Sequence, residues 1–419
     1  MTGAVMSREP DWESFVRRHW EKTPAHLSLD VPVVFPEQVF RSLVAVCAPF
    51  RFGTRFRALP DVRLFVEAAQ LGAPGPLLPG EDDAGVSDYV RRASAGLGGR
   101  PFQLFVEQPF MFDFTLWDPV RRFVRGLLER VGLPVLPIVS ELLLGNFPQT
   151  PRGVAKRPNH ALFTLVLHGR LRVRLWEKLW GDAPGETVDF DRHHADATTL
   201  EAGAGEWLYT PSRLWQLDEA RGDCMALRLW VPVQGSRPTD AVKEVLVALL
   251  EARSAHDEAV PYLPYPWRRP RKGKRTTAPP LERTGDDLEA LLRSPDVHQA
   301  LRIIWARRVS ACGLEPAPPP DKAVPLRDTD LVRGVPSADI VRMGERPGPW
   351  IWAVNGHVFP GMGTTVAQKV LQALASDEAH AVGELRRLAR RGAQREELDA
   401  ALEKLQRLRA LQVVTGEEG

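Results

Sequence analysis

The sequence predicts an α+β fold in three parts. Residues 1–238 read as a barrel of short strands with N-terminal helices, 239–335 as a helical linker or dimerisation-type region, and 336–419 as a small helical unit with β elements. Three observations support this division of the chain. Short apolar segments between Gly and Pro turns fill the first half. The apolar period becomes helical after Thr239. A hairpin and three helices follow near the C-terminus.

Composition excludes several classes of protein. The 419 residues are 44% hydrophobic and 26% charged, as in a soluble globular protein with two or three domains. The formal charge of +2 gives no global field toward nucleic acid or membrane. Cys47, Cys224 and Cys312 form no zinc or disulfide spacing, which suits a reducing cytoplasm. No signal core or long apolar run is present, so we expect a cytoplasmic protein without a membrane span.

The N-terminal part alternates helices with short strands. Residues 11–30 open with an amphipathic helix that Pro24 ends. Residues 36–100 read as short apolar segments between Pro/Gly loops, with one further helix around Tyr89. Gln103 to Val106 reads as a strand, and Asp118 to Val131 as a clear amphipathic helix.

The chain is organised around residues 141–176. This stretch predicts a strand, a loop, a strand, a tight turn and a strand. The signals are, in order, an apolar run, a Pro/Gly loop, a second apolar run from Ala161, the Gly169-Arg170 turn and an alternating segment that ends at Trp176. Residues 188–199 then read as a polar loop, and 200–233 as further short strands.

The C-terminal half is mainly helical. Helices are expected from Thr239 and over 285–309, and residues 313–330 read as a stiff Pro-rich linker. Asn355-Gly356 marks a hairpin turn. Helices over 365–374, 382–391 and 396–411 and a short final strand complete the unit.

Three places in residues 11–235 carry a resemblance to known proteins. They are Phe15, Trp20 and Pro24; Thr150-Pro151 and Gly153-Val154 with Phe163, Gly169-Arg170 and Trp176; and Gly205 to Pro211 with Leu214 to Gln216. They resemble bacterial Jumonji/cupin-type proteins, relatives of the Fe(II)- and 2-oxoglutarate-dependent hydroxylases. The C-terminal unit is similar to the winged helix of the ribosomal-oxygenase branch. The resemblance implies a double-stranded β-helix followed by a winged-helix domain.

These hydroxylases hold Fe(II) with two histidines and one carboxylate. The resemblance places the ligand positions at Ala155, Arg157 and Gln216, or, in a second register, at Lys156-Arg157-Pro158. Alanine cannot ligate, Gln is a weak donor, and a cation beside Fe(II) costs roughly several kcal/mol at a partly buried site. We therefore predict a degenerate site with no catalytic residue and no metal ligand.

A displaced metal site is the alternative. His160 and His168 lie on one predicted strand, and His193 and His194 lie in a loop. Residues eight apart on a strand are roughly 26 Å apart, so His160 and His168 cannot share one metal unless the strand bends.

The leading hypothesis is a catalytically inactive binding or accessory protein. Its cavity would recognise a peptide, a protein or an anionic ligand, because cations at a cavity mouth favour carboxylate or phosphate. The candidate cavity residues are Lys156, Arg157, Arg170, Tyr209 and Trp215. No cofactor is expected; Fe(II) and 2-oxoglutarate enter only if the chain is an active hydroxylase of a peptide or protein, the first alternative.

The second alternative is a nucleic-acid binder. It would use the C-terminal unit and a basic run that otherwise reads as a solvated linker. The basic residues are Arg268, Arg269, Arg271, Lys272, Lys274 and Arg275. A protein or peptide partner and a homodimer rank above nucleic acid, and no membrane partner is expected.

Overall fold

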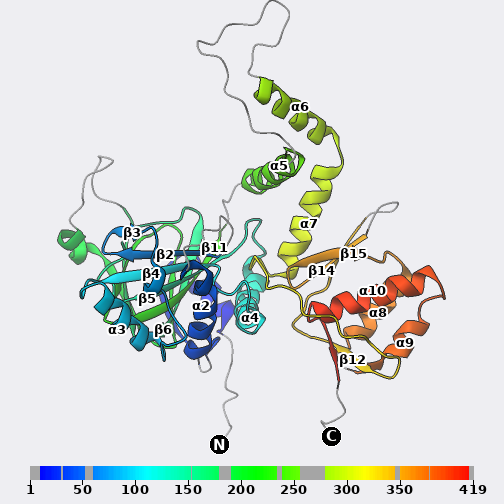
Figure 1. The fold of residues 1–419 in the computed structure, drawn as a ribbon, viewed down its shortest axis with the longest axis horizontal. Coiled ribbons are helices and arrows are strands. Elements are labelled where there is room, and N and C mark those ends of the chain that lie inside the picture. The colour runs from blue at the N-terminus through cyan, green and yellow to red at the C-terminus, as the bar shows by residue number, and fades with distance from the viewer. Residues whose placement is uncertain are drawn as a thin grey trace, which may run out of the picture.

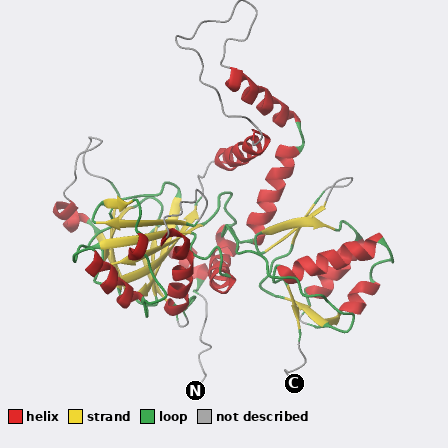
Figure 2. Cartoon of the chain, viewed as in Figure 1, coloured by secondary structure: helices red, strands yellow, loops and turns green. Residues whose placement is uncertain are grey.

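A computed structural model describes residues 10–29, 32–51, 60–151, 153–178, 190–233, 238–254, 279–344, 350–376 and 378–414. It shows an N-terminal body of two antiparallel sheets with helices, an arm of three helices, and a C-terminal unit of helices and small sheets (Figures 1 and 2). The α+β class predicted from the sequence is therefore confirmed, and its sheets are antiparallel. No described helix is long and apolar enough to cross a membrane.

The larger sheet has eight strands in the order β1-β9-β6-β11-β5-β4-β2-β3. Its strands are β1 (Ala25–Ser28), β2 (Asp61–Val66), β3 (Ala69–Leu71), β4 (Phe102–Glu107), β5 (Val139–Gly145), β6 (His160–His168), β9 (Glu206–Thr210) and β11 (Cys224–Pro232). The smaller sheet has the order β10-β7-β8, with β7 (Arg170–Trp176), β8 (Thr198–Gly203) and β10 (Trp215–Ala220). A 3-10 helix, η2 (Phe190–Asp196), precedes β8.

Side chains alternate between the two faces of the larger sheet. Leu142 and Leu144 of β5 pack in the core under the helices, whereas Leu143 packs in the core between the two sheets. The helices are α1 (Trp12–Arg18), α2 (Pro36–Arg51), α3 (Val86–Gly96) and α4 (Phe114–Val131), with a 3-10 turn, η1 (Gly75–Leu77). The body is thus layered as helices, large sheet and small sheet.

The tight turn between β6 and β7 requires glycine. Gly169 has φ +75°, and a Cβ there would lie 1.9 Å from the carbonyl oxygen of Asp223. The strand, loop, strand, turn and strand predicted for residues 141–176 are confirmed by β5, β6 and β7.

The arm consists of α5 (Pro238–Ser254), α6 (Pro279–Arg293) and α7 (Asp296–Ser310). The C-terminal unit has its own core and contains α8 (Thr365–Leu374), α9 (Val382–Arg387) and α10 (Ala393–Arg407). Its sheets are β16-β12-β17 and β13-β14-β15. The strands are β12 (Leu331–Gly334), β13 (Val341–Met343), β14 (Trp350–Val354), β15 (His357–Gly361), β16 (His380–Ala381) and β17 (Leu411–Val413). The predicted Asn355-Gly356 hairpin is confirmed, with φ 46° and 77° at its two turn residues.

The segment after α7 fastens the body to the C-terminal unit. The backbone N–H of Ile138 donates to the carbonyl of Gly313 at 2.7 Å, and the indole of Trp117 donates to the carbonyl of Leu314 at 3.2 Å. Arg121 is fully buried on α4 and donates to the carbonyl of Ser337 at 2.6 Å.

Two local predictions were wrong. The amphipathic helix predicted to open residues 11–30 is present as α1, but it ends at Arg18 rather than at Pro24, and Ala25–Ser28 form a strand paired with β9. Residues 36–51, expected to be short segments and loops, form α2, whose buried stripe includes Val39, Leu43 and Val46. Cys47, Cys224 and Cys312 are free and buried.

Candidate functional site

A pocket of about 370 Å3 lies at the polar end of the space between the two sheets. Elsewhere in this space the facing side chains are apolar, for example Leu143 and Ala226. Glu141 on β5 lies two residues from Leu143, and Arg228 on β11 lies two residues from Ala226, on the same faces of these strands. Glu141 and Arg228 are direct cross-strand partners. The lining residues are Arg63, Phe65, Phe105, Glu107, Glu141, Thr150, Gly153, Ala155, Lys156, Arg157, Pro158, Gln216, Asp218, Arg228 and Trp230.

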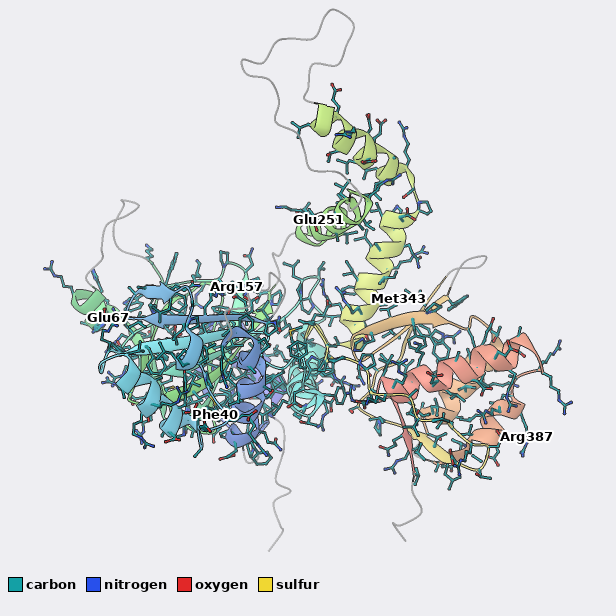
Figure 3. The ribbon with its side chains drawn as sticks, viewed as in Figure 1. Phe40, Glu67, Arg157, Glu251, Met343 and Arg387 are labelled. Carbon is teal, nitrogen blue, oxygen red and sulfur yellow. The ribbon has the colours of Figure 1, made fainter. Side chains whose placement is uncertain are left out.

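The structure brings together four residues that the sequence placed at the metal-ligand positions. Ala155 and Gln216 form an isolated antiparallel bridge: the N–H of Ala155 donates to Gln216 at 2.8 Å, and that of Gln216 donates back at 2.9 Å. Lys156 and Arg157 follow directly and line the same pocket. Figure 3 labels Arg157 on the opposite side of the body from Phe40 in that view.

A network of ion pairs fills the inner part of the pocket. Arg228 pairs with the buried carboxylate of Asp218 at 3.1 Å, and its Nε lies 3.8 Å from Glu141. Arg157 reaches the other oxygen of Glu141, also at 3.8 Å. Burial raises the pKa of Asp218, Arg228 opposes this, and Glu141 adds to it. The charge of the Asp218 carboxylate is thus compensated mainly by Arg228.

The pocket carries four cations (Arg63, Lys156, Arg157, Arg228) and three carboxylates (Glu107, Glu141, Asp218), a formal excess of +1 from 4 − 3. Six inner residues of the pocket were not predicted from the sequence: Arg63, Glu107, Glu141, Asp218, Arg228 and Trp230. One signal was available, namely single charged residues inside otherwise apolar strands, as in Glu141 before three leucines and Arg228 between two. The pairing register between strands that are far apart in the sequence was needed to show that these residues line one pocket.

Three residues predicted for the cavity lie outside it. Arg170 is exposed at the start of β7, in the turn region at the other end of the strand. Tyr209 faces the helical core, packs 4.9 Å from the ring of Phe15, and bonds the N–H of Glu21 through its hydroxyl at 2.8 Å. Trp215 contacts the site only indirectly, with the Nζ of Lys156 5.0 Å from its ring. Strand alternation turns Tyr209 away, and none of Arg170, Tyr209 and Trp215 is among the residues that line this pocket.

The histidines proposed for a displaced metal site are scattered. His160 bonds the carbonyl of Pro158 at 2.8 Å, and His168 bonds the hydroxyl of Ser87 at 3.1 Å. His193 and His194 sit in η2, where His194 lies 3.8 Å from Glu219 on the outer face of the small sheet. The described residues contain no group of three His, Cys, Asp or Glu that could hold a metal ion. The pocket residues therefore do not fit a site of two histidines and one carboxylate.

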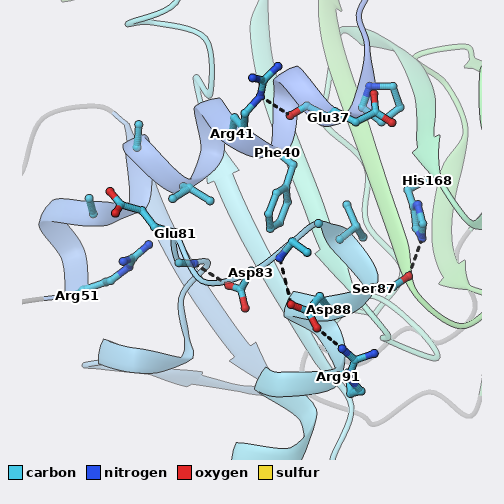
Figure 4. Close-up of a pocket in the computed structure, with 18 residues that line it drawn as sticks. Glu37, Phe40, Arg41, Arg51, Glu81, Asp83, Ser87, Asp88, Arg91 and His168 are labelled. Carbon is cyan, nitrogen blue, oxygen red and sulfur yellow. Dashed lines mark hydrogen bonds and ion pairs between the residues drawn. The ribbon is translucent and has the colours of Figure 1, made fainter.

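A larger cavity, about 890 Å3, lies elsewhere, between α2 and the start of α3 (Figure 4). Its Asp88 pairs with Arg91, and its Asp83 pairs with Arg92 at 2.6 Å. Each of these carboxylates is already paired with a nearby arginine, so only its larger volume favours this cavity over the smaller pocket as a candidate site. We take the smaller pocket as the candidate site because its charged groups converge from five strands and one loop.

The predicted anionic-partner patch, Arg268, Arg269, Arg271, Lys272, Lys274 and Arg275, lies outside the described residues. Its role stays a prediction from sequence.

No protein-family model matches the chain, and no curated protein matches it. Solved structures similar to it include the ribosomal oxygenase YcfD from Escherichia coli. One structure shares 16% identity over 97% of this chain and 98% of that one, with a TM-score of 0.47. Another shares 15% identity over 97% and 99%, with a TM-score of 0.49. The resemblance to the ribosomal-oxygenase branch, stated from the sequence, is confirmed in that these are the neighbours of the chain. At such identities the likeness concerns the fold.

The expectation of no cofactor is corrected. The E. coli protein was crystallised with cobalt and succinic acid, and with cobalt and 2-oxoglutarate. A metal ion and 2-oxoglutarate are therefore ligands of that neighbour, and the expectation that the present chain works without a cofactor is withdrawn.

Proposed function

We propose that the pocket between the two sheets binds an anionic ligand, either a small carboxylate or a carboxylate-bearing segment of a protein or peptide. This proposal rests on one observation: the two cations at the rim of the pocket, Lys156 and Arg157, are weakly paired within the protein. Lys156 makes no ion pair within 4 Å among the described residues, and Arg157 approaches only Glu141, at 3.8 Å. Both side chains are partly exposed, so each has donors available to a ligand.

The rest of the pocket suits a short carbon chain with a charged end. Phe65, Phe105 and Trp230 supply apolar walls beside the cations. A volume of about 370 Å3 falls at the lower end of the range for small-ligand sites. A ligand whose carboxylate lies between Lys156 and Arg157 and whose carbon chain packs against these rings uses both the cations and the apolar walls.

Hydroxylation of a peptide or protein remains the alternative that the resemblance implies. It requires two imidazoles and a carboxylate around one metal ion, whereas the loop at this point reads Ala155, Lys156 and Arg157. Metal and 2-oxoglutarate are therefore partners to be tested directly.

We further infer a double-stranded β-helix over residues 1–238, a dimerisation region over 239–335 and a winged helix over 336–419. Support comes from the two facing sheets and from the separate core of the C-terminal unit. Exposed apolar residues on the arm, Val247, Leu281, Leu292 and Trp305, support a second copy of this chain or another protein as its partner.

The test is calorimetric titration of the purified protein with succinate and with 2-oxoglutarate, each with and without Fe(II) under anaerobic conditions. Replacing Lys156 and Arg157 together by Ala is expected to weaken binding about tenfold, because partly exposed charge contacts contribute roughly 1 kcal/mol or less each. Arg170→Ala, an exposed arginine on the same body, is the matched control and is expected to bind normally.

Two results contradict the proposal. One is the absence of binding by either carboxylate, or binding that the double variant leaves unchanged. The other is stoichiometric Fe(II) binding together with 2-oxoglutarate turnover, which would establish the hydroxylase instead.

A further inference from the structure

Two carboxylates in the pocket stand directly opposite each other. Glu107 on β4 and Glu141 on β5 are register partners, and both line the pocket. Directly opposed residues have Cβ atoms roughly 4.5–5.5 Å apart, and like charges in that position are destabilising. The row continues with Asp61 on β2 as the other partner of Glu107 and Arg228 as the other partner of Glu141.

Glu107 is the member of this pair with the weaker counter-charge. Among the described residues its one ion pair is with Arg63, at 3.8 Å, and Arg63 is held more closely by Asp61, at 2.9 Å. Glu141 lies between two arginines, Arg157 and Arg228. The negative charge on Glu107 is therefore the one least compensated among the described pocket carboxylates.

We propose that Glu107 is a proton-controlled regulator of the anion pocket: its carboxylate opposes an incoming anion, and its protonated form admits one. This rests on the proposed function. Protonation of Glu107 changes the formal charge of the pocket from +1 to +2, since one of the three carboxylates is neutralised. Coulombic attraction for a bound anion rises accordingly.

The environment of Glu107 favours proton uptake. Burial raises its pKa, Glu141 raises it further, Arg157 and Arg63 oppose the shift, and Asp61 adds to it. A bound anion adds another negative charge nearby, which raises this pKa again. By reciprocity, anion binding takes up a proton and the affinity rises as the pH falls.

Other groups around the pocket titrate differently. Asp218 also has a pKa raised by burial, but it is paired with Arg228 at 3.1 Å. His160 has a pKa lowered by burial, and its ring nitrogen is bonded to the carbonyl of Pro158 rather than lying in the pocket lining.

The experiment is titration with 2-oxoglutarate, whose two carboxyl groups stay ionised, from about pH 5.5 to about pH 8. The protein is first passed over a chelating resin. The wild type is expected to bind more tightly at the lower pH, by up to about tenfold for a one-unit rise in the pKa of Glu107 on anion binding. Glu107→Gln is expected to bind at pH 8 about as tightly as the wild type at low pH, with no remaining pH dependence.

Glu201→Gln is the matched control because it removes the same charge from the outer face of the small sheet, where Glu201 pairs with Arg172 at 3.1 Å. It is expected to keep the wild-type pH dependence. If Glu107→Gln does not fold, proton uptake by the wild type is measured by calorimetry in two buffers of different ionisation enthalpy.

The outcomes separate the two proposals. No binding at any pH overturns the proposed function. Binding without pH dependence, without proton uptake, or with a pH dependence that persists in Glu107→Gln overturns the regulatory role of Glu107 alone.

Discussion

The ion pair between Arg228 and Asp218 offers a sharp test of the pocket's construction. The side chains of Arg228 and Asp218 are only 9% and 4% exposed and their charged atoms lie 3.1 Å apart. Arg228→Met keeps an unbranched apolar stem and removes the guanidinium with its charge, which leaves Asp218 buried beside Glu141. Breaking a buried pair from one side costs about 3–5 kcal/mol, a large part of a typical unfolding free energy of about 5–15 kcal/mol.

The loss of unfolding free energy in Arg228→Met is expected to depend on pH in one direction. Burial already raises the pKa of Asp218, and loss of Arg228 removes the opposing effect. A carboxyl whose pKa is higher in the folded state than the ordinary value of about 3.9 stabilises the fold most below that value. Its contribution is lost as the pH rises toward the folded-state pKa. The deficit of Arg228→Met is therefore expected to be large at neutral pH and to shrink in acid.

The assay is urea unfolding followed by far-UV circular dichroism at neutral pH and in mild acid. Arg228→Met with Asp218→Asn is the matched double variant, expected to recover most of the loss because no uncompensated charge remains. A single-variant loss below about 1 kcal/mol, or a double variant no more stable than the single one, would refute the buried-pair reasoning.

Two further predictions concern the turn and the arm. Gly169→Ala is expected to lower the unfolding free energy by about 2 kcal/mol or more, because strain at φ +75° adds to a contact 1.9 Å from the carbonyl of Asp223. Gly205→Ala, at φ +88° with open space around it, should cost only about 1 kcal/mol, and equal losses in urea melts would contradict the steric argument. We also expect a dimer formed through the arm, since Leu281 and Leu292 of α6 are 64% and 59% exposed. Sedimentation should show the wild type as a dimer and Leu281→Ser with Leu292→Ser as a monomer, and a monomeric wild type would sink the expectation.

The sequence alone determined the elements whose signals are local. Gly169-Arg170 between two apolar runs specified the β6–β7 turn, because only glycine tolerates that backbone conformation so near Asp223. Asn355-Gly356 specified the C-terminal hairpin in the same way. The loop at Ala155, Lys156 and Arg157 also led, from local sequence, to the prediction that the metal ligands of the resembled family are replaced, and this stays a prediction.

Tertiary structure decided which residues share the pocket. Glu141 and Arg228 are 87 positions apart (228 − 141), yet the β5–β11 register makes them direct partners. Strand alternation turned Tyr209 toward the helical core, and the β7–β10 register placed Arg170 at the end of its strand away from the pocket. Long-range strand pairing depends on the free energy of the whole packed body, so no local pattern in the sequence could have placed Glu107 opposite Glu141.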